Sequence, residues 1–189
     1  ISPSTEEPCT EITLGTQADV DAAVSAARQA FKTFSQTSRE ERIALMNRII
    51  EEYKKRIPDF AKSMAAEMGA PVSFATMAQA PAGLGGFLGT LPALENFAFK
   101  EQHGANTVVY EPIGVVGLIT PWNWPLNQIA LKVAPCIAAG NTMVLKPSEE
   151  CPGNAAIFAE VMDAAGVPPG VFNLVQGDGP TVGNAISAH

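Results

Sequence analysis

Two polar clusters follow apolar, β-branched runs of the sequence, and proline punctuates each cluster. Residues 115–119 (VVGLI) run into TPWNWP, and residues 142–145 (TMVL) run into KPSE. The clusters offer hydroxyl, indole, amide, ammonium and carboxylate groups, which can hydrogen-bond a polar ligand. In an open parallel sheet, ligands bind just beyond the carboxyl ends of the strands. Two neighbouring strands that end in such loops therefore predict one shared site.

Four motifs of the chain resemble those of the NAD(P)-dependent aldehyde dehydrogenases. They are EPIGVVG (111–117), TPWNWP (120–125), KPSE (146–149) and GDGPTVG (177–183), in the family's order and at its spacing. Four linked motifs are far more specific than a lone glycine-rich loop. The resemblance extends from near the N-terminus to His189 and is strongest from Glu111 onward. It implies oxidation of an aldehyde to a carboxylic acid with NAD(P), through a thiohemiacetal on a cysteine.

The resemblance gives Asn123 a catalytic role. Addition of a thiolate to an aldehyde develops negative charge on the former carbonyl oxygen, and an oriented amide in a dry site stabilises it. Losing one such donor costs roughly 3–4 kcal/mol. Considered without the motif, Asn123 is more simply a cap for a helix that starts at Pro125.

The resemblance also implies cofactor contacts from these loops. Trp122 would donate its indole N–H to the pyrophosphate, although tryptophans usually pack in a core. Lys146 and Glu149 would face the ribose hydroxyls, although the sequence alone would favour a solvated surface pair. Because a 2′-phosphate would meet the Glu149 carboxylate, NAD is favoured, with NADP as the alternative. The expected cofactor-binding residues are Thr120, Trp122, Lys146, Ser148, Glu149, Gly179, Pro180 and Gly183.

The glycine pattern at 177–183 is one residue longer than the usual dinucleotide fingerprint. Alone it could be merely a turn that enters a helix. The resemblance places Gly179 and Pro180 near the adenine and lets Gly183 pack closely, so the pyrophosphate is not expected to be cradled here in the ordinary Rossmann manner.

A helical face follows the first polar cluster, made of residues at i, i+3, i+4 and i+7 spacing. In the family, the corresponding helix borders the substrate tunnel. Two amides on this face suggest a tunnel more polar than one built for long alkyl aldehydes. The expected tunnel residues are Trp124, Asn127, Gln128 and Leu131.

The three cysteines, Cys9, Cys136 and Cys151, do not suit a nucleophile. Cys136 lies in an apolar helical setting, where thiols are usually inert. An odd number without a CxxC pair fits a reducing compartment, so we expect a cytoplasmic protein without a metal site. The family's nucleophilic cysteine and general-base glutamate belong to motifs beyond His189. Because the chain also starts at Ile1 rather than methionine, we expect a fragment that is inactive alone.

Composition limits the partners of the chain. Of its 189 residues, 47% are hydrophobic and 16% charged, against about 25% charged in typical domains. This composition is typical of a piece of a larger protein with much buried surface, or of a chain that buries apolar surface in an oligomer. The net charge of −7 argues against nucleic acid, which needs a basic stripe. Prolines interrupt the two long uncharged stretches, 68–94 and 112–131, so no membrane span is expected. The expected partners are a small-molecule aldehyde and further copies of the chain, as a homodimer or homotetramer.

Helical patterns fill the first half of the chain. Capping boxes at 16–19 and 38–41 open two helices, and Pro58 is predicted to start a third that stops at Gly69. Residues 72–99 suggest a helix, diluted by glycine and proline, that packs closely against other helices. A channel wall or a subunit interface is the alternative. Residues 107–110 form a short strand, in a region that the family uses to join subunits.

Strands and helices alternate from Gly114 onward. The expected strands are 115–119, 142–145 and 171–175, and the expected helices are 125–139, 152–165 and one that begins near Thr181. This rhythm predicts an α/β fold with a doubly wound, Rossmann-type parallel sheet, truncated after its third strand. The expected divisions are 1–105 (helical part of the cofactor-binding domain), 106–113 (oligomerisation strand) and 114–189 (first part of the NAD-binding sheet).

Two other functions remain open on the same scaffold. One is a non-catalytic dinucleotide-binding or structural protein, because a fold does not guarantee a function. The other is a relative that uses the same cysteine to transfer the acyl group to coenzyme A.

Overall fold

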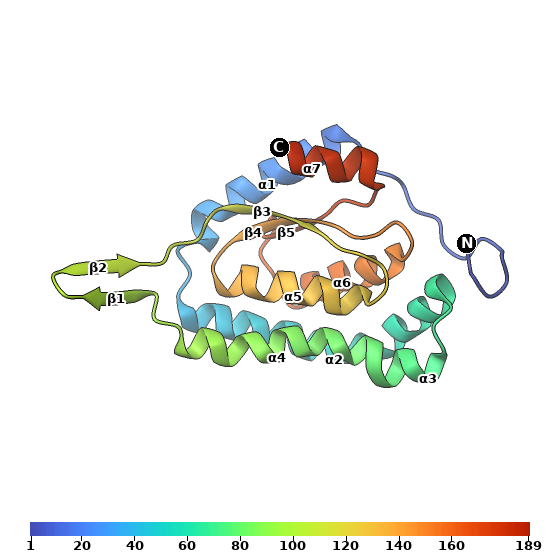
Figure 1. Cartoon of the computed structure of the whole chain (residues 1–189), viewed down its shortest axis with the longest axis horizontal. Coiled ribbons are helices and arrows are strands. Elements are labelled where there is room, and N and C mark those ends of the chain that lie inside the picture. Colours follow the sequence, from blue (N-terminus) through green and yellow to red (C-terminus); the bar gives the residue numbers. More distant parts are fainter.

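A parallel sheet with the strand order β3–β4–β5 lies at the centre of the computed structural model, which describes residues 1–189 (Figure 1). The strands are β3 (Val115–Ile119), β4 (Thr142–Lys146) and β5 (Phe172–Leu174). Every residue of β4 is buried, as expected for a central parallel strand covered on both faces. The predicted alternation of strands and helices is confirmed.

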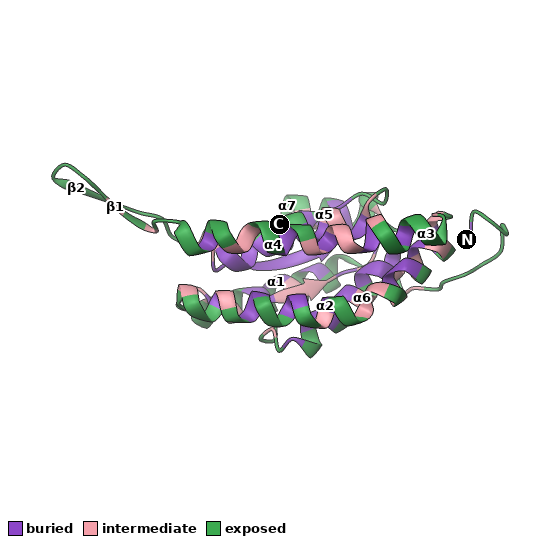
Figure 2. Cartoon of the chain, turned by 90° about the horizontal axis from the view of Figure 1, so that it is seen from below, coloured by how far each residue is buried: buried purple, intermediate pink, exposed green.

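Helices cover both faces of the sheet (Figure 1). Helix α1 (Gln17–Phe34) and the short α7 (Asn184–Ala188) lie on one face, and α5 (Pro125–Ala138) and α6 (Pro152–Ala164) lie on the other. Outside α5 and α6 is a further layer, formed by α2 (Arg39–Met68) and α4 (Ala80–Asn96). The buried sides of α2, α4, α5 and α6 face one another in Figure 2 and, with buried residues of β3 and β4, form most of a core of 30 residues.

The predicted helix start at Pro58 is wrong, because α2 runs unbroken through this residue. Proline removes one backbone hydrogen bond from a helix and normally bends or ends it. Here Tyr53 and Phe60, on either side of it, are fully buried, and their ring centroids are 4.7 Å apart. Burial of both rings in one core favours a continuous helix. The predicted stop at Gly69 is confirmed by its left-handed conformation, with φ of 67°.

Both predicted capping boxes are present. The Asp19 carboxylate accepts the Thr16 backbone N–H at 2.7 Å. The Ser38 box is reciprocal, since Glu41 accepts the Ser38 N–H at 2.6 Å and the Ser38 hydroxyl accepts the Glu41 N–H at 3.1 Å. These contacts satisfy N–H groups at the start of each helix that have no partner within it.

Residues 72–96 form a helical segment that packs closely on α5. It begins with α3 (Val72–Phe74), widens into the π-helix η1 (Ala75–Gln79) and continues as α4. A Cβ added at Gly86 would lie 2.9 Å from the Ala130 backbone, so only glycine allows this approach. The close-packed reading of this segment is confirmed.

Charged side chains of α2 hold the ends of the neighbouring helices. Arg42 donates to the Ala138 carbonyl of α5 at 3.1 Å, and Arg48 donates to the Ala165 carbonyl after α6 at 2.9 Å. At its other end, α2 places the Glu67 carboxylate 2.9 Å from the Gly153 N–H of α6. Cations at helix C-termini and anions at N-termini complement the helix dipoles. Helix α2 therefore fixes α5 and α6, which begin at the loops of the predicted site.

A two-stranded hairpin projects from the body of the chain (Figure 1). Its strands are β1 (Lys100–His103) and β2 (Asn106–Val109), so the predicted strand is confirmed with a shift of one residue. Strand β1 was not predicted, because its sequence KEQH lacks β-branched and aromatic residues. No helix in the chain has the length and apolar character to cross a membrane.

Candidate functional site

The two polar loops begin side by side at the carboxyl ends of β3 and β4. The Thr120 N–H donates to the Lys146 carbonyl at 3.1 Å, which continues the strand pairing into the loops. Further along, the Cys151 thiol lies 3.7 Å from the Trp122 carbonyl and joins the first loop to the start of α6. The sequence motifs at 120–125 and 146–149 therefore meet at one edge of the sheet.

Lys146 is buried at the centre of this edge, with only 3% of its side chain exposed. Its ammonium donates to the Glu149 carboxylate at 2.9 Å and to the carbonyls of Pro147 and Gly177, each at 2.7 Å. The alternative of a solvated surface pair is therefore wrong for Lys146. Its three donors hold together the loops that follow β4 and β5.

Glu149 presents its carboxylate to solvent from the same cluster, with 43% of its side chain exposed. The hydrogen bond from Lys146 is the main cause that lowers the pKa of the Glu149 carboxyl. A lowered pKa keeps the carboxylate ionised at neutral pH, and the contact is lost only as the pH falls through that lowered value. The site thus carries a fixed negative charge beside a buried cation.

The aromatic loop after β3 exposes the groups that the resemblance assigns to cofactor and substrate. Trp122 is 52% exposed, so packing in the core does not explain it. Asn123 is also exposed. The N-cap of α5 is Trp124, and no side chain caps that helix, so the capping alternative for Asn123 is not realised. Both side chains are free to face a ligand.

The predicted tunnel face of α5 lies opposite its buried side. Trp124, Asn127 and Gln128 are half-buried and Leu131 is 54% exposed, whereas Leu126, Ile129, Ala130 and Val133 on the other side are buried. The edge of the Trp124 ring packs against Phe74, with centroids 5.7 Å apart. The four residues therefore form one accessible face, as their spacing predicts.

The glycine segment after β5 forms a π-helix, η2 (Gly179–Gly183), rather than an ordinary turn. The Asp178 carboxylate caps it by accepting the Thr181 N–H at 2.8 Å. A Cβ on Gly183 would lie 3.8 Å from the Lys146 stem, so Gly183 borders the lysine, whereas Gly179 and Pro180 are exposed. The predicted helix near Thr181 thus starts two residues earlier, as a wider turn.

Ser148 completes the predicted set on the second loop. It is buried, and its hydroxyl accepts the Glu150 N–H at 3.3 Å. In this arrangement Ser148 shapes the loop that carries Glu149.

Sequence reasoning missed Gln79 and Phe74, which both contact the aromatic loop. Gln79, from η1, donates its amide to the Asn123 carbonyl at 3.3 Å. Gln79 is the one polar residue in the run AQAPAG (78–83), and this was the only feature of the sequence that could have indicated its role.

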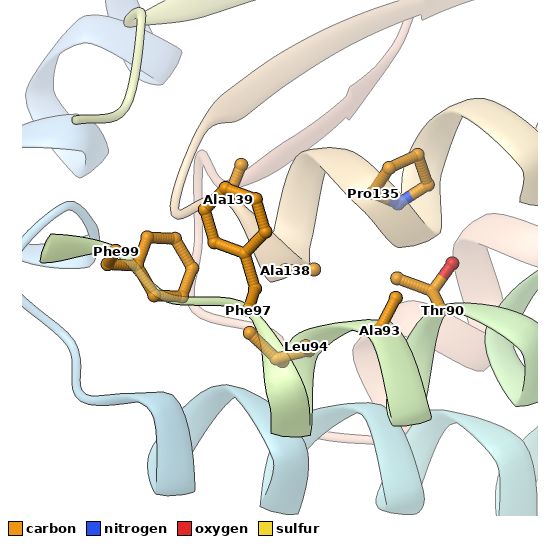
Figure 3. A pocket seen from close by; sticks show the side chains of 8 residues that line it. All are labelled: Thr90, Ala93, Leu94, Phe97, Phe99, Pro135, Ala138 and Ala139. Carbon is orange, nitrogen blue, oxygen red and sulfur yellow. The ribbon is translucent and has the colours of Figure 1, made fainter. Parts of the chain in front are cut away.

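An apolar cavity of about 200 Å³ lies at the opposite end of α5 (Figure 3). Phe97 and Phe99 reach into it from the segment after α4, and Pro135 borders it from α5. Thr90 supplies the one polar side chain of its lining. Ligand sites generally combine apolar walls with a few convergent polar groups, and this cavity lacks that set.

The cysteines should differ sharply in reactivity. Burial raises the pKa of the Cys136 thiol to about 11, and burial with nearby carboxylates raises that of Cys151 to about 12. Cys9 is exposed. At mildly alkaline pH, iodoacetamide should alkylate the exposed Cys9 and leave the buried Cys136 and Cys151 unmodified in the native protein. Peptide mapping checks this, with the denatured protein, alkylated at all three, as control; native modification of Cys151 would contradict it.

The chain has clear relatives. A family model of the aldehyde dehydrogenase family matches residues 1–189. The chain is 53% identical over 190 residues to 3-succinoylsemialdehyde-pyridine dehydrogenase of a Pseudomonas species, covering 100% of this chain and 40% of that protein. It thus spans about 40% of the length of the curated relatives that it matches.

Solved structures agree. Aldehyde dehydrogenase from Bartonella henselae superposes with a TM-score of 0.97 at 49% identity, over 100% of this chain and 40% of that one. A mutant of aldehyde dehydrogenase C from Pseudomonas syringae, in complex with NAD+ and octanal, superposes with a TM-score of 0.98 at 48% identity, over 100% of this chain and 39% of that one. This chain belongs to the aldehyde dehydrogenase family.

Proposed function

We propose that residues 1–189 form part of an NAD-dependent enzyme that oxidises an aldehyde to a carboxylic acid. The observation that carries the proposal is the joint placement of an exposed Trp122–Asn123 loop and a buried Lys146 that pairs with the ionised Glu149. These groups supply hydrogen-bond donors and a fixed charge where parallel sheets bind ligands. Family membership, together with the NAD+ present in the structure from Pseudomonas syringae, supports this choice of cofactor.

Asn123 has the catalytic role in this proposal. Its amide donates to the oxygen of the aldehyde as a thiolate adds to the carbonyl carbon and the C=O electron pair moves onto oxygen. Bound NAD would accept the two electrons that leave the aldehyde carbon. The thiolate would come from residues outside 1–189, because the family's nucleophilic cysteine belongs to a later motif and this chain spans about 40% of the length of its relatives. A glutamate, also outside this range, would activate the water that releases the acid.

The remaining residues would hold the cofactor and guide the substrate. Trp122 would donate to the pyrophosphate, and Glu149 would accept from the ribose hydroxyls. Lys146 would exchange one of its three present hydrogen bonds for a ribose hydroxyl. Thr120 and Ser148 would line the same crevice, with Gly179, Pro180 and Gly183 toward the adenine. The α5 face would border the substrate path, with the half-buried amides of Asn127 and Gln128 favouring polar aldehydes.

Steady-state kinetics test the function directly. The intact protein should form NADH in the presence of an aldehyde, with a carboxylic acid as product and no need for coenzyme A. Strict dependence on coenzyme A would favour the acyl-transferring alternative. Binding of NAD without turnover of any aldehyde would favour a non-catalytic protein.

Glu149→Gln should weaken the preference for NAD over NADP. A carboxylate facing a 2′-phosphate is a like-charge contact that costs several kcal/mol. Its removal should raise the affinity for NADP relative to NAD at least about tenfold, which corresponds to about 1.4 kcal/mol. Titration calorimetry with both cofactors measures the ratio. Glu150→Gln, at the next exposed position, is the matched control. An equal change of the NADP-to-NAD affinity ratio in both variants would show that Glu149 does not bind the ribose.

The assembly and location of the intact protein are further parts of the proposal. The projecting hairpin exposes Val108 and Val109, which are 38% and 56% accessible, and burying them against a second copy would hide apolar surface. We therefore expect the intact protein to form a homodimer or homotetramer. From its cysteine pattern we also expect it to lie in the cytoplasm. Helices α2 and α4 share one core with α5 and α6, which supports their assignment to the cofactor-binding domain. The 106–113 and 114–189 divisions stay predictions.

A further inference from the structure

Gln79 is a buried amide whose oxygen has no hydrogen-bond partner. Its side chain is 5% exposed, and its nitrogen donates to the Asn123 backbone carbonyl at 3.3 Å. A buried acceptor without a partner destabilises a fold, and an apolar side chain of similar length would avoid that cost. The amide is therefore best explained by what its nitrogen does.

The backbone around Gln79 is also unusual. Gln79 is the last residue of the π-helix η1, which interrupts an otherwise α-helical segment. Such π-turns are rare and are often found at functional sites, because they change the direction in which the following side chains point. Here the turn brings the Gln79 amide to the aromatic loop after β3.

The same helical segment holds this loop at a second point. Phe74, one residue before η1, packs edge-on against the Trp124 ring, with centroids 5.7 Å apart. Asn123 lies between these two contacts. Gln79 bonds the backbone carbonyl of Asn123, and Phe74 packs against the side chain of the next residue, Trp124. Since no cap restrains the exposed Asn123 side chain, its direction depends on how firmly its peptide is held.

We infer that Gln79 is a positioning residue that orients Asn123 toward the oxygen of the aldehyde. This inference rests on the proposed oxyanion role of Asn123 and adds the group that sets its geometry. Small displacements of a catalytic group are costly, because a shift of about 1 Å can lower a rate on the order of 100-fold. Gln79 would therefore affect turnover without touching the substrate.

The test is a double-mutant cycle in the intact protein. Gln79→Met removes the donor, keeps the side-chain length and removes the unpartnered oxygen. It should lower kcat about 10- to 100-fold, with KM for the aldehyde and Kd for NAD nearly unchanged and Tm not reduced. In the Asn123→Ala background it should have no further effect, because the group that it positions is gone. Gln79→Leu, which fills the site with a different shape, should repeat this pattern.

Gln176 offers a matched control. Its amide also donates to a backbone carbonyl, that of Pro152 at 2.9 Å, and its oxygen is likewise buried without a partner. Any loss of kcat in Gln176→Met should multiply with that of Asn123→Ala, because its bond does not hold the aromatic loop.

The outcomes separate the two claims. If the losses from Gln79→Met and Asn123→Ala multiply, or if kcat of Gln79→Met and Gln79→Leu equals that of the wild type, the positioning role is overturned while the function of Asn123 stands. If Asn123→Ala alone leaves kcat unchanged, the proposed oxyanion role fails and the inference fails with it.

Discussion

Replacing Asn123 with alanine in the intact protein should lower kcat for aldehyde oxidation about 10²- to 10³-fold, the loss typical of one oxyanion donor. The amide contributes mainly once negative charge has developed on the aldehyde oxygen, so the loss falls on kcat. KM for the aldehyde and Kd for NAD should change little. Steady-state kinetics and cofactor titration measure these quantities separately.

The fold should tolerate this substitution. Asn123 is exposed, and no side chain caps the helix that follows it, so Tm should stay close to that of the wild type. Asn96→Ala is a suitable control, because Asn96 is also exposed and bonds only the Pro92 carbonyl, at 2.7 Å, near the end of α4. Its kcat should match the wild type. A kcat for Asn123→Ala within about twofold of the control would contradict the oxyanion role.

The largest expected effect on stability is that of Phe158→Ala. Phe158 is fully buried in α6, and its ring lies 6.4 Å from Tyr53, 6.3 Å from Phe87 and 5.6 Å from Phe172. It therefore joins the outer helices to the sheet. Truncating such a ring leaves a cavity that neighbouring helices cannot close, and the free energy of unfolding should fall by about 3–5 kcal/mol.

Denaturant unfolding followed by circular dichroism measures this loss. Phe97→Ala is the matched control, because Phe97 is 44% exposed and its truncation leaves no closed cavity. Phe158→Leu, which keeps most of the volume, should cost less than about 1.5 kcal/mol. Equal denaturant concentrations at the unfolding midpoint for Phe158→Ala and Phe97→Ala would show that this aromatic cluster does not stabilise the core.

The local pattern of the sequence predicted most of the fold. Apolar β-branched runs gave the three strands of the parallel sheet, and glycine at 69 marked a helix end as expected. The predicted helix start at Pro58 was wrong because the proline signal depends only on neighbouring residues. The buried rings of Tyr53 and Phe60 stabilise the continuous helix through contacts with other elements of the core. Strand β1 was missed because its polar sequence forms a strand only through pairing with β2.

The candidate site was predictable only in part. The motif predicted that Lys146 and Glu149 lie on the same loop, and the structure adds the hydrogen bond between them. The burial of Lys146 and its bond to Gly177 depend on a segment 31 residues away, and the bond from Gln79 to Asn123 spans 44 residues. Such contacts follow from the packing of layers, which local spacing does not encode.

A crystal structure of the intact protein with bound NAD would show whether this edge of the sheet is the cofactor site. We expect the dinucleotide to lie at the carboxyl ends of β3 and β4, with its adenosine ribose on Lys146 and Glu149. Its pyrophosphate should meet Trp122, and its nicotinamide should approach Asn123. A dinucleotide bound elsewhere, or one that leaves Lys146 and Glu149 untouched, would rule out this cofactor site.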